Sequence, residues 1–180
     1  IAEYWHNNHP YLESELPSKM SKNRFVDLYG NIFENSEWIA KAAYELELGP
    51  AHNCAAGIHS VLSRVFRSAS QEQRLSVLRS HPDLAGKIAQ SRGLTDTSKD
   101  EQMSAGLDNL NAQEQKQFEK LNKAYIQKHG FPFIIAVRDH TKESILEIFE
   151  KRIENERNKE FFNACKEVER IAEIRLMDIF

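Results

Sequence analysis

The sequence predicts an all-α fold, a single-domain bundle of about eight or nine helices. From residue 18 onward, apolar residues recur at spacings of three and four, which is the spacing of one face of a helix. The only strand-like run, residues 131–137, is short and has no partner strand elsewhere in the sequence. We therefore expect this run to be a buried extended segment inside a helical protein.

Composition narrows the class of protein. The 180 residues suffice for one domain with a real core, and 41% apolar residues, 28% charged residues and a net charge of −3 indicate no basic nucleic-acid surface. No apolar run approaches the roughly 20 residues of a membrane span. With only Cys54 and Cys165, a disulfide scaffold is not expected, and a reducing, cytoplasmic location fits best. Scattered histidines and the lack of metal-binding spacings predict no metal site, and the sequence has no GxGxxG motif and no Walker loop.

The first half of the chain begins with an irregular stretch. Residues 1–17 are polar and contain Pro10 and Pro17, so we expect an N-terminal arm or extension, followed by the helical domain over residues 18–180. Ser18 or Ser21 is expected to cap the first helix. Further helices are predicted over about residues 38–46 and 52–67, and another opens at Ser70.

The second half contains clearer start and stop signals. Ser98 and Glu101 form a capping-box pattern, which predicts a helix that continues through Leu107 and Leu110. A later helix, which begins at Asn111, is expected to end at Gly130. The remaining helices are predicted to begin at Thr141 and at about Lys159, the last one running to the chain end.

His81 stands out because Pro82 follows it. Proline suits the first position of a helix and disfavours an α conformation for the residue before it. The pattern therefore predicts a helix that opens at Pro82, with His81 extended beside the positive end of the helix dipole. A histidine held in this way is suited to proton transfer, and the alternative is a helix-boundary residue without a chemical role.

Arg175 falls on the apolar face of the last helix. The other members of this face are Phe161, Cys165, Val168, Ala172 and Ile179. A charged side chain on such a face is rarely buried unless it is paired. Two interpretations follow: the head group reaches water near the helix end, or the guanidinium is presented to an anionic ligand such as a carboxylate.

Two further features allow both a structural and a functional interpretation. Glu101 either bonds back to Ser98 as part of a helix cap or is available for chemistry, since it lies off the apolar stripe. The buried extended segment must satisfy its backbone N–H and C=O groups. Either neighbouring loops and water do so, or a polar ligand lies against the segment.

Several fragments, in order along the chain, resemble one family. They are residues 80–86, which contain His-Pro-Asp-Leu, residues 101–102 with 104–107, and residues 121–125 with 130–138. Together they are similar to OHCU decarboxylases, the 2-oxo-4-hydroxy-4-carboxy-5-ureidoimidazoline decarboxylases that complete the conversion of urate to (S)-allantoin in purine catabolism. The resemblance covers about residues 20–180.

The resemblance implies an all-helical, cofactor-free homodimer that decarboxylates a small ureide. It implies catalytic roles for His81, Glu101 and Arg175. The substrate contacts that it implies are Pro82, Ser98, Lys99, Asp100, Glu101, Gln102, Phe133, Ile134, Ile135, Ala136 and Val137. Open alternatives are a peroxisomal location, a fusion with another urate-pathway enzyme, and a helical interaction module without enzymatic activity.

Overall fold

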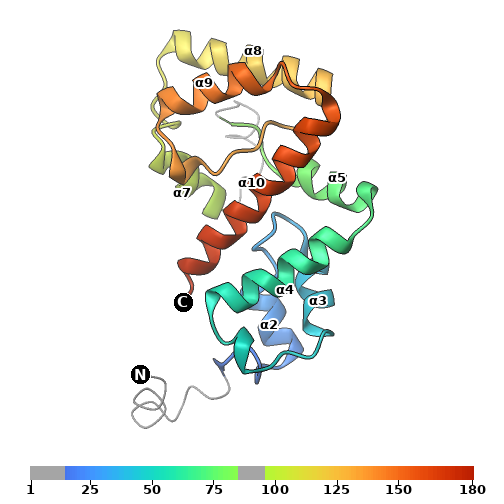
Figure 1. The fold of residues 1–180 in the computed structure, drawn as a ribbon. Coiled ribbons are helices and arrows are strands. Elements are labelled where there is room, and N and C mark those ends of the chain that lie inside the picture. Colours follow the sequence, from blue (N-terminus) through green and yellow to red (C-terminus); the bar gives the residue numbers. More distant parts are fainter. Residues whose placement is uncertain (1–14, 85–95) are drawn as a thin grey trace. The chain divides into compact units, whose positions relative to one another are not determined.

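A computed structural model of the chain describes residues 15–84 and 96–180 (Figure 1). Its α-helices are α2 (Lys22–Tyr29), α3 (Glu37–Tyr44), α4 (Ala55–Ser68), α5 (Gln71–Ser80), α7 (Asp96–Ser104), α8 (Ala112–His129), α9 (Lys142–Arg152) and α10 (Arg157–Met177). Two short 3-10 helices, η2 (Pro50–His52) and η3 (Val137–Asp139), complete the described elements. The described residues form no strand, so the all-α prediction is confirmed. Within those residues, no helix has the length and apolar character that a membrane crossing requires.

The fold consists of two compact units. The first comprises the chain up to Ser70 together with Ala172–Phe180, and the second comprises Gln71–Ile171. Helix α10 therefore contributes residues to both units. Because the first unit includes the end of α10, it is not continuous in sequence.

The first unit is built on α2, α3 and α4. Ser21, the second of the two predicted caps, begins α2, and its Oγ accepts a hydrogen bond from the Arg24 N–H at 3.3 Å. The Cys54 thiol does the same for α4, where it accepts from the Gly57 N–H at 3.4 Å. α2 packs against α3, and α3 against α4. The fully buried aromatic side chains of this unit are Phe25, Phe33 and Phe66.

The predicted N-terminal arm is described only from Glu15 onward, and residues 1–14 lie outside the described part of the chain. Pro17 is buried, and the Glu15 carboxylate accepts hydrogen bonds from Arg24 at 3.2 and 3.0 Å. The end of the predicted arm is thus in contact with α2. The domain boundary at residue 17 stays a prediction.

In the second unit, α8 has the bounds that the sequence predicts. The Asn111 side chain accepts from the Gln113 and Glu114 N–H groups, and the Glu114 carboxylate accepts from the Asn111 N–H. At the other end Gly130 has a φ of +83°, a left-handed conformation that glycine adopts without strain. Thr141 caps α9 as predicted, since its Oγ1 accepts from the Ser144 N–H at 3.3 Å.

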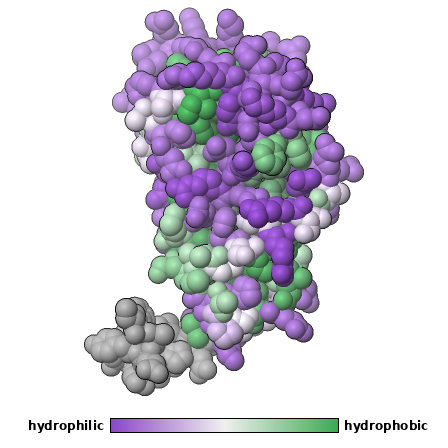
Figure 2. Space-filling view, viewed as in Figure 1, coloured by the Kyte–Doolittle hydropathy of each residue, from purple (hydrophilic) through white to green (hydrophobic). Residues whose placement is uncertain are grey.

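Helices α8 and α9 pack against each other (Figure 1). Aromatic side chains form the core beneath them. The Phe133 and Phe149 rings stack at 3.9 Å between centroids, and the edge of Tyr125 meets both rings. Hydrophilic residues predominate over the outer surface of these two helices in Figure 2. This separation of faces is typical of amphipathic helices that cover one side of a core.

Helix α7 differs from its prediction at both ends. It is already helical at Asp96, so Ser98 lies inside the helix and does not cap it. It ends at Ser104 because Gly106 adopts a φ of +73°, and the N–H groups of Gly106 and Leu107 bond back to the carbonyls of Met103 and Gln102. This pattern is a Schellman motif, which stops a helix. The predicted continuation through Leu107 and Leu110 was therefore wrong.

Helix α10 also differs slightly from its prediction. It begins at Arg157, two residues before Lys159, and ends at Met177, three residues before the chain end. Ile179 lies beyond the helix and is exposed, so it does not belong to the buried face. Cys165, Val168 and Ala172 are buried, as the predicted face requires.

Stability should depend on pH through His129, the last residue of α8. Its side chain is fully buried, its Nε2 lies 3.4 Å from the Ile153 carbonyl, and its Nδ1 has no hydrogen-bond partner among the described residues. Burial lowers the pKa of this imidazole below its ordinary value. Between that lowered value and the ordinary pKa of about 6.5, the unfolded chain binds more protons than the folded chain.

The free energy of unfolding should therefore decrease as pH falls from about 7.5 to about 5.5, since protons favour the unfolded chain in this range. Urea denaturation at both pH values measures the loss. In His129→Gln, the amide keeps a hydrogen-bond donor but does not titrate, so the loss should be smaller. An equal loss in both proteins would show that His129 is not the responsible group.

Candidate functional site

His81 lies directly after α5, not before a helix. Its N–H bonds to the Leu78 carbonyl at 3.3 Å, and its side chain is only 8% exposed. Pro82 and Asp83 have no regular structure, so the prediction of a helix opening at Pro82 was wrong, and residues 85–95 lie outside the described part. The residue before a proline also commonly ends a helix, and this second meaning of the pattern applies here.

This position reverses the electrostatic expectation for the imidazole. The end of α5 presents backbone carbonyl groups, and the C-terminal end of a helix favours a cation. The Nδ1 of His81 lies 3.0 Å from the Val77 carbonyl oxygen. A carbonyl can only accept, so Nδ1 carries a hydrogen in this arrangement. Proton exchange with another molecule would then involve Nε2.

The chain on both sides of His81 is fixed to α8. The Nε of Arg79 donates to the Gly130 carbonyl at 2.9 Å, and the Nδ2 of Asn122 donates to the Leu84 carbonyl at 2.7 Å. The Asn122 side chain is buried. Burial also raises the pKa of the carboxyl group of Asp83, two residues after His81. These bonds hold His81 in a defined place relative to α8 and to the segment that follows Gly130.

That segment is buried, as predicted, and it belongs to no helix or strand. Residues 131–136 have no regular structure and are all buried, and Val137 begins η3. Protein side chains satisfy two of its backbone groups: an Arg152 guanidinium nitrogen donates to the Ile134 carbonyl, and the Glu167 carboxylate accepts from the Ala136 N–H, both at 2.8 Å. The Ile135 N–H, by contrast, has no hydrogen-bond partner in the described part of the chain.

A buried carboxylate fixes Arg152 in turn. Glu160 is fully buried and accepts hydrogen bonds from Tyr125 at 2.6 Å, Arg152 at 2.6 Å and Asn155 at 2.8 Å. Burial alone would raise the pKa of the Glu160 carboxyl, but the bonds from Tyr125 and Arg152 outweigh it and hold the pKa below its ordinary value. Arg152 also lies 4.6 Å above the centre of the Phe133 ring. The extended segment is therefore held by an ionised, hydrogen-bonded network.

The structure brings the other predicted contact region close to this segment. Helix α7 packs against η3, which directly follows residues 131–136. Ser98 is buried, Glu101 and Gln102 are half-buried and Asp100 is exposed, whereas the Lys99 side chain lies outside the described residues. The cap alternative for Glu101 was wrong, because Ser98 does not cap α7. Two predicted groups of substrate contacts thus lie on adjacent elements.

Arg175 is buried and paired. Its side chain is 4% exposed, so the interpretation in which its head group reaches water was wrong. It donates to the Glu34 carboxylate at 2.8 Å and to the Ile32 carbonyl at 3.4 Å. Arg175 and Glu34 belong to the first unit, whereas His81 and Glu101 belong to the second. A site that unites all three predicted catalytic residues stays a prediction.

No sequence pattern pointed directly to Glu34, Arg152 and Glu167, the side chains that fix predicted site residues. The charge of Arg175 on an apolar face indicated a need for a carboxylate, but Glu34 lies in an irregular stretch 141 residues away. In the sequence, Glu167 and Arg152 are indistinguishable from the ordinary polar residues of amphipathic helices. Among the residues that the structure describes, no cluster of three or more His, Cys, Asp or Glu side chains is arranged to hold a metal.

Comparison with known proteins shows similarity over almost the whole chain. The family model described as OHCU decarboxylase matches residues 18–177. A 2-oxo-4-hydroxy-4-carboxy-5-ureidoimidazoline decarboxylase of Halalkalicoccus jeotgali is 38% identical over 90% of this chain and 88% of its own. The uric acid degradation bifunctional protein PucL of Bacillus subtilis is 36% identical over 90% of this chain but only 31% of its own.

Solved structures agree with these sequence matches. The crystal structure of (S)-allantoin synthase superimposes with a TM-score of 0.72 at 26% identity, and the match covers 90% of this chain and 51% of that one. An OHCU decarboxylase crystallised in the presence of (S)-allantoin gives a TM-score of 0.66 at 21% identity, over 83% of this chain and 94% of that one. The second likeness shows that the fold is shared.

The pair of Arg175 and Glu34 should be costly to break from one side. Glu34→Ala leaves a buried guanidinium without its carboxylate, so we expect a loss of about 3–5 kcal/mol in the free energy of unfolding, measured by urea denaturation. The matched control is Glu37→Ala, which removes an exposed carboxylate paired with Lys41 and should change stability by about 0.5 kcal/mol or less. Replacing both partners with apolar residues, Glu34→Leu with Arg175→Met, should cost less than Glu34→Ala alone. A loss below about 1 kcal/mol in Glu34→Ala would contradict the pairing.

Proposed function

The chain belongs to the OHCU decarboxylase family, and on that premise we propose that it converts 2-oxo-4-hydroxy-4-carboxy-5-ureidoimidazoline to (S)-allantoin, the last step of urate degradation. The match of the family model over residues 18–177 is the observation that supports this most strongly. A relative with 38% identity over nine-tenths of this chain bears a name for the same activity.

The reaction makes limited demands on the protein. The substrate has a carboxylate on a ring carbon that also bears a hydroxyl group, and breaking the C–C bond to this carboxylate releases CO2. The electron pair moves into the bond to the neighbouring ring carbon, which bears the ureido group, and the C=N nitrogen of that carbon takes up the charge, so the substrate itself supplies the electron sink. The protein must orient the carboxylate out of the ring plane, stabilise the developing charge and deliver one proton to one face of the ureido-bearing carbon.

We assign the proton transfer to His81. The Val77 carbonyl fixes the ring through Nδ1, which directs proton exchange to Nε2. The carbonyl end of α5 favours the protonated imidazole, so His81 would begin the cycle as the acid. In this scheme it gives its proton to the ureido-bearing ring carbon next to the carbon that loses CO2, while the hydroxyl proton passes to the ring nitrogen and the hydroxyl becomes the ring carbonyl of allantoin. Glu101 is the proposed carboxylate partner of this step, because it matches the family's glutamate.

We assign substrate binding to the elements around the extended segment. Pro82 follows His81 directly, and α7 contributes Ser98, Lys99, Asp100, Glu101 and Gln102 beside η3. The main chain of Phe133, Ile134, Ile135, Ala136 and Val137 would offer amide groups to the ureide. A ureide has adjacent N–H and C=O groups, so it can pair with a backbone amide in the way that two strands do.

Arg175 is the proposed third catalytic residue, and its resemblance to the family's C-terminal arginine supports this. Its role would be to bind the substrate carboxylate, a task that suits a planar guanidinium. The ion pair with Glu34 would then fix the orientation of the guanidinium. We also propose a homodimer in the cytoplasm without a cofactor, and functional coupling to other urate-pathway enzymes, since two relatives are bifunctional uric acid degradation proteins.

Steady-state kinetics tests the assignment of His81 and Glu101. The substrate is made in situ from urate with urate oxidase, and its ultraviolet absorbance and the circular dichroism of (S)-allantoin are followed. His81→Asn and Glu101→Gln should each reduce kcat by about 100-fold or more, because both remove a proton-transfer group. His59→Asn, a control on α4 in the first unit, should leave kcat unchanged within about twofold. Near-normal kcat in His81→Asn would overturn the assignment.

The homodimer is tested by the mass in solution. Light scattering on the purified protein should give about twice the chain mass of 20.8 kDa, since the proposal requires two copies per particle. A mass equal to that of one chain at micromolar concentration would contradict the dimer without affecting the proposed reaction.

A further inference from the structure

One face of α10 runs along the extended segment and η3. Glu160 holds Arg152, whose guanidinium bonds to the Ile134 carbonyl, while Glu167 bonds directly to the Ala136 N–H. Arg170 then bonds to the Asp139 carboxylate in η3 at 2.8 and 3.0 Å. Residues 160, 167 and 170 are separated by seven and three positions, so they share one helix face. This face fixes the segment at Ile134 and Ala136, and fixes η3 at Asp139.

The alternation of an extended chain gives these contacts a direction. Backbone groups of residues two apart point to the same edge, and those of the residue between them point to the opposite edge. Ile134 and Ala136 therefore present their backbone groups to one edge, where Arg152 and Glu167 bind them. Ile135 presents its N–H and C=O to the other edge, and its N–H has no partner among the described residues.

We propose that Glu167 is a positioning residue for the decarboxylation: by holding the Ala136 N–H, it aims the opposite edge of the segment, with the Ile135 backbone groups, at the ureide. This inference rests on the proposed function. Glu167 acts through the segment and does not touch the substrate. Its carboxylate supplies the strong acceptor that a buried N–H requires, since hydrogen bonds to charged groups are stronger than neutral ones.

The position of Glu167 makes this role testable without unfolding the protein. Its side chain is half-buried, unlike the fully buried Glu160, whose replacement would disturb four hydrogen-bonding neighbours at once. Without Glu167 the Ala136 N–H must find another partner, and the segment moves to do so. Small displacements of positioning groups have large effects on turnover, because binding and orientation both depend on geometry at the ångström scale.

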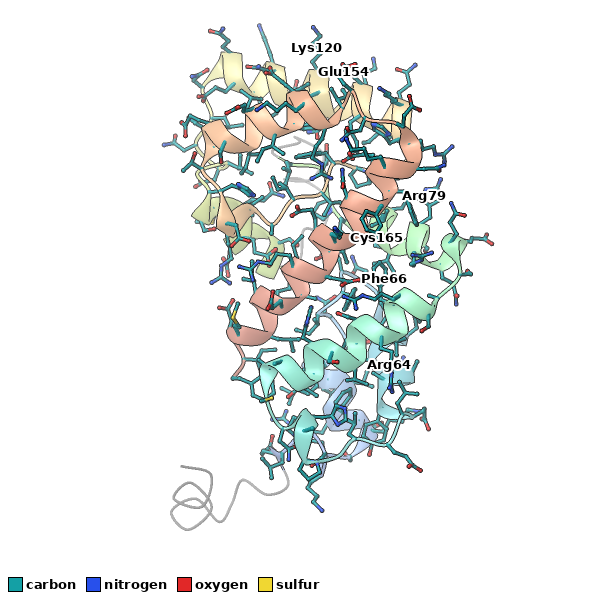
Figure 3. All side chains as sticks on the ribbon, viewed as in Figure 1. Arg64, Phe66, Arg79, Lys120, Glu154 and Cys165 are labelled. Atoms are coloured by element: carbon teal, nitrogen blue, oxygen red, sulfur yellow. The ribbon has the colours of Figure 1, made fainter. Side chains whose placement is uncertain are left out.

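The experiment compares Glu167→Ala with Glu167→Gln, which keeps an oxygen that can accept the Ala136 N–H. Glu154→Ala serves as the matched control, because this exposed carboxylate lies just after α9 (Figure 3). Three quantities are measured on the whole chain: KM and kcat with freshly made substrate, amide hydrogen exchange of a peptide covering residues 131–137, and the thermal unfolding midpoint.

We expect Glu167→Ala to raise KM about tenfold with a smaller change in kcat, and to accelerate exchange of the Ala136 amide about tenfold. Glu167→Gln and Glu154→Ala should stay within about threefold of the wild type in both measurements. A merely structural role would lower the unfolding midpoint without separating KM from kcat.

Three results would overturn the proposal. Unchanged exchange at Ala136 in Glu167→Ala would show that the carboxylate does not hold the segment. Faster exchange with unchanged KM would show that the segment does not position the substrate. If Glu167→Gln raised KM as much as Glu167→Ala, the hydrogen bond to the Ala136 N–H would not be the cause of the effect. If the wild type itself shows no turnover, the proposed function fails together with the substrate role of Glu167, while the exchange measurement still decides whether Glu167 holds the segment.

Discussion

The second unit depends on the hydrogen bonds that surround the buried carboxylate of Glu160. A charge without solvent is tolerated only where donors surround it, and here a tyrosine hydroxyl, a guanidinium and two amides supply them. The arrangement connects α8, the end of α9 and the start of α10 at one point. The guanidinium that compensates Glu160 also bonds to the Ile134 carbonyl, so the same charge pair fixes the extended segment.

An extended segment inside a helical protein poses a hydrogen-bonding problem, and the solution here is asymmetric. Side chains of the neighbouring helices satisfy the backbone groups on one edge, where a sheet would use another strand. On the opposite edge the Ile135 N–H has no partner among the described residues, and the proposed function assigns this group to the ureide. The fold therefore holds the segment rigidly and leaves backbone polar groups available, whereas a regular sheet or helix would have used these groups in its own hydrogen bonds.

Local signals determined which parts of the fold could be predicted. Helix α8 has a capping box at Asn111 and a left-handed glycine at its end, and both signals are complete within a few residues. The helix predicted to open at Pro82 was wrong because a His-Pro pair is found both where a helix begins, at the proline, and where a helix ends, at the residue before the proline. The partner of Arg175 was out of reach for a different reason: Glu34 meets it only through tertiary packing. The resemblance named site residues, but not the side chains that support them.

Gly130 connects two parts of the molecule that are distant in sequence. Its left-handed backbone ends α8 and turns the chain into the extended segment, while its carbonyl receives Arg79, two residues before His81. A Cβ added there would lie 3.4 Å from the Arg157 guanidinium as well as requiring a strained φ. A substitution at this single bend would thus shift the imidazole and the amide-bearing segment together, although it would touch neither.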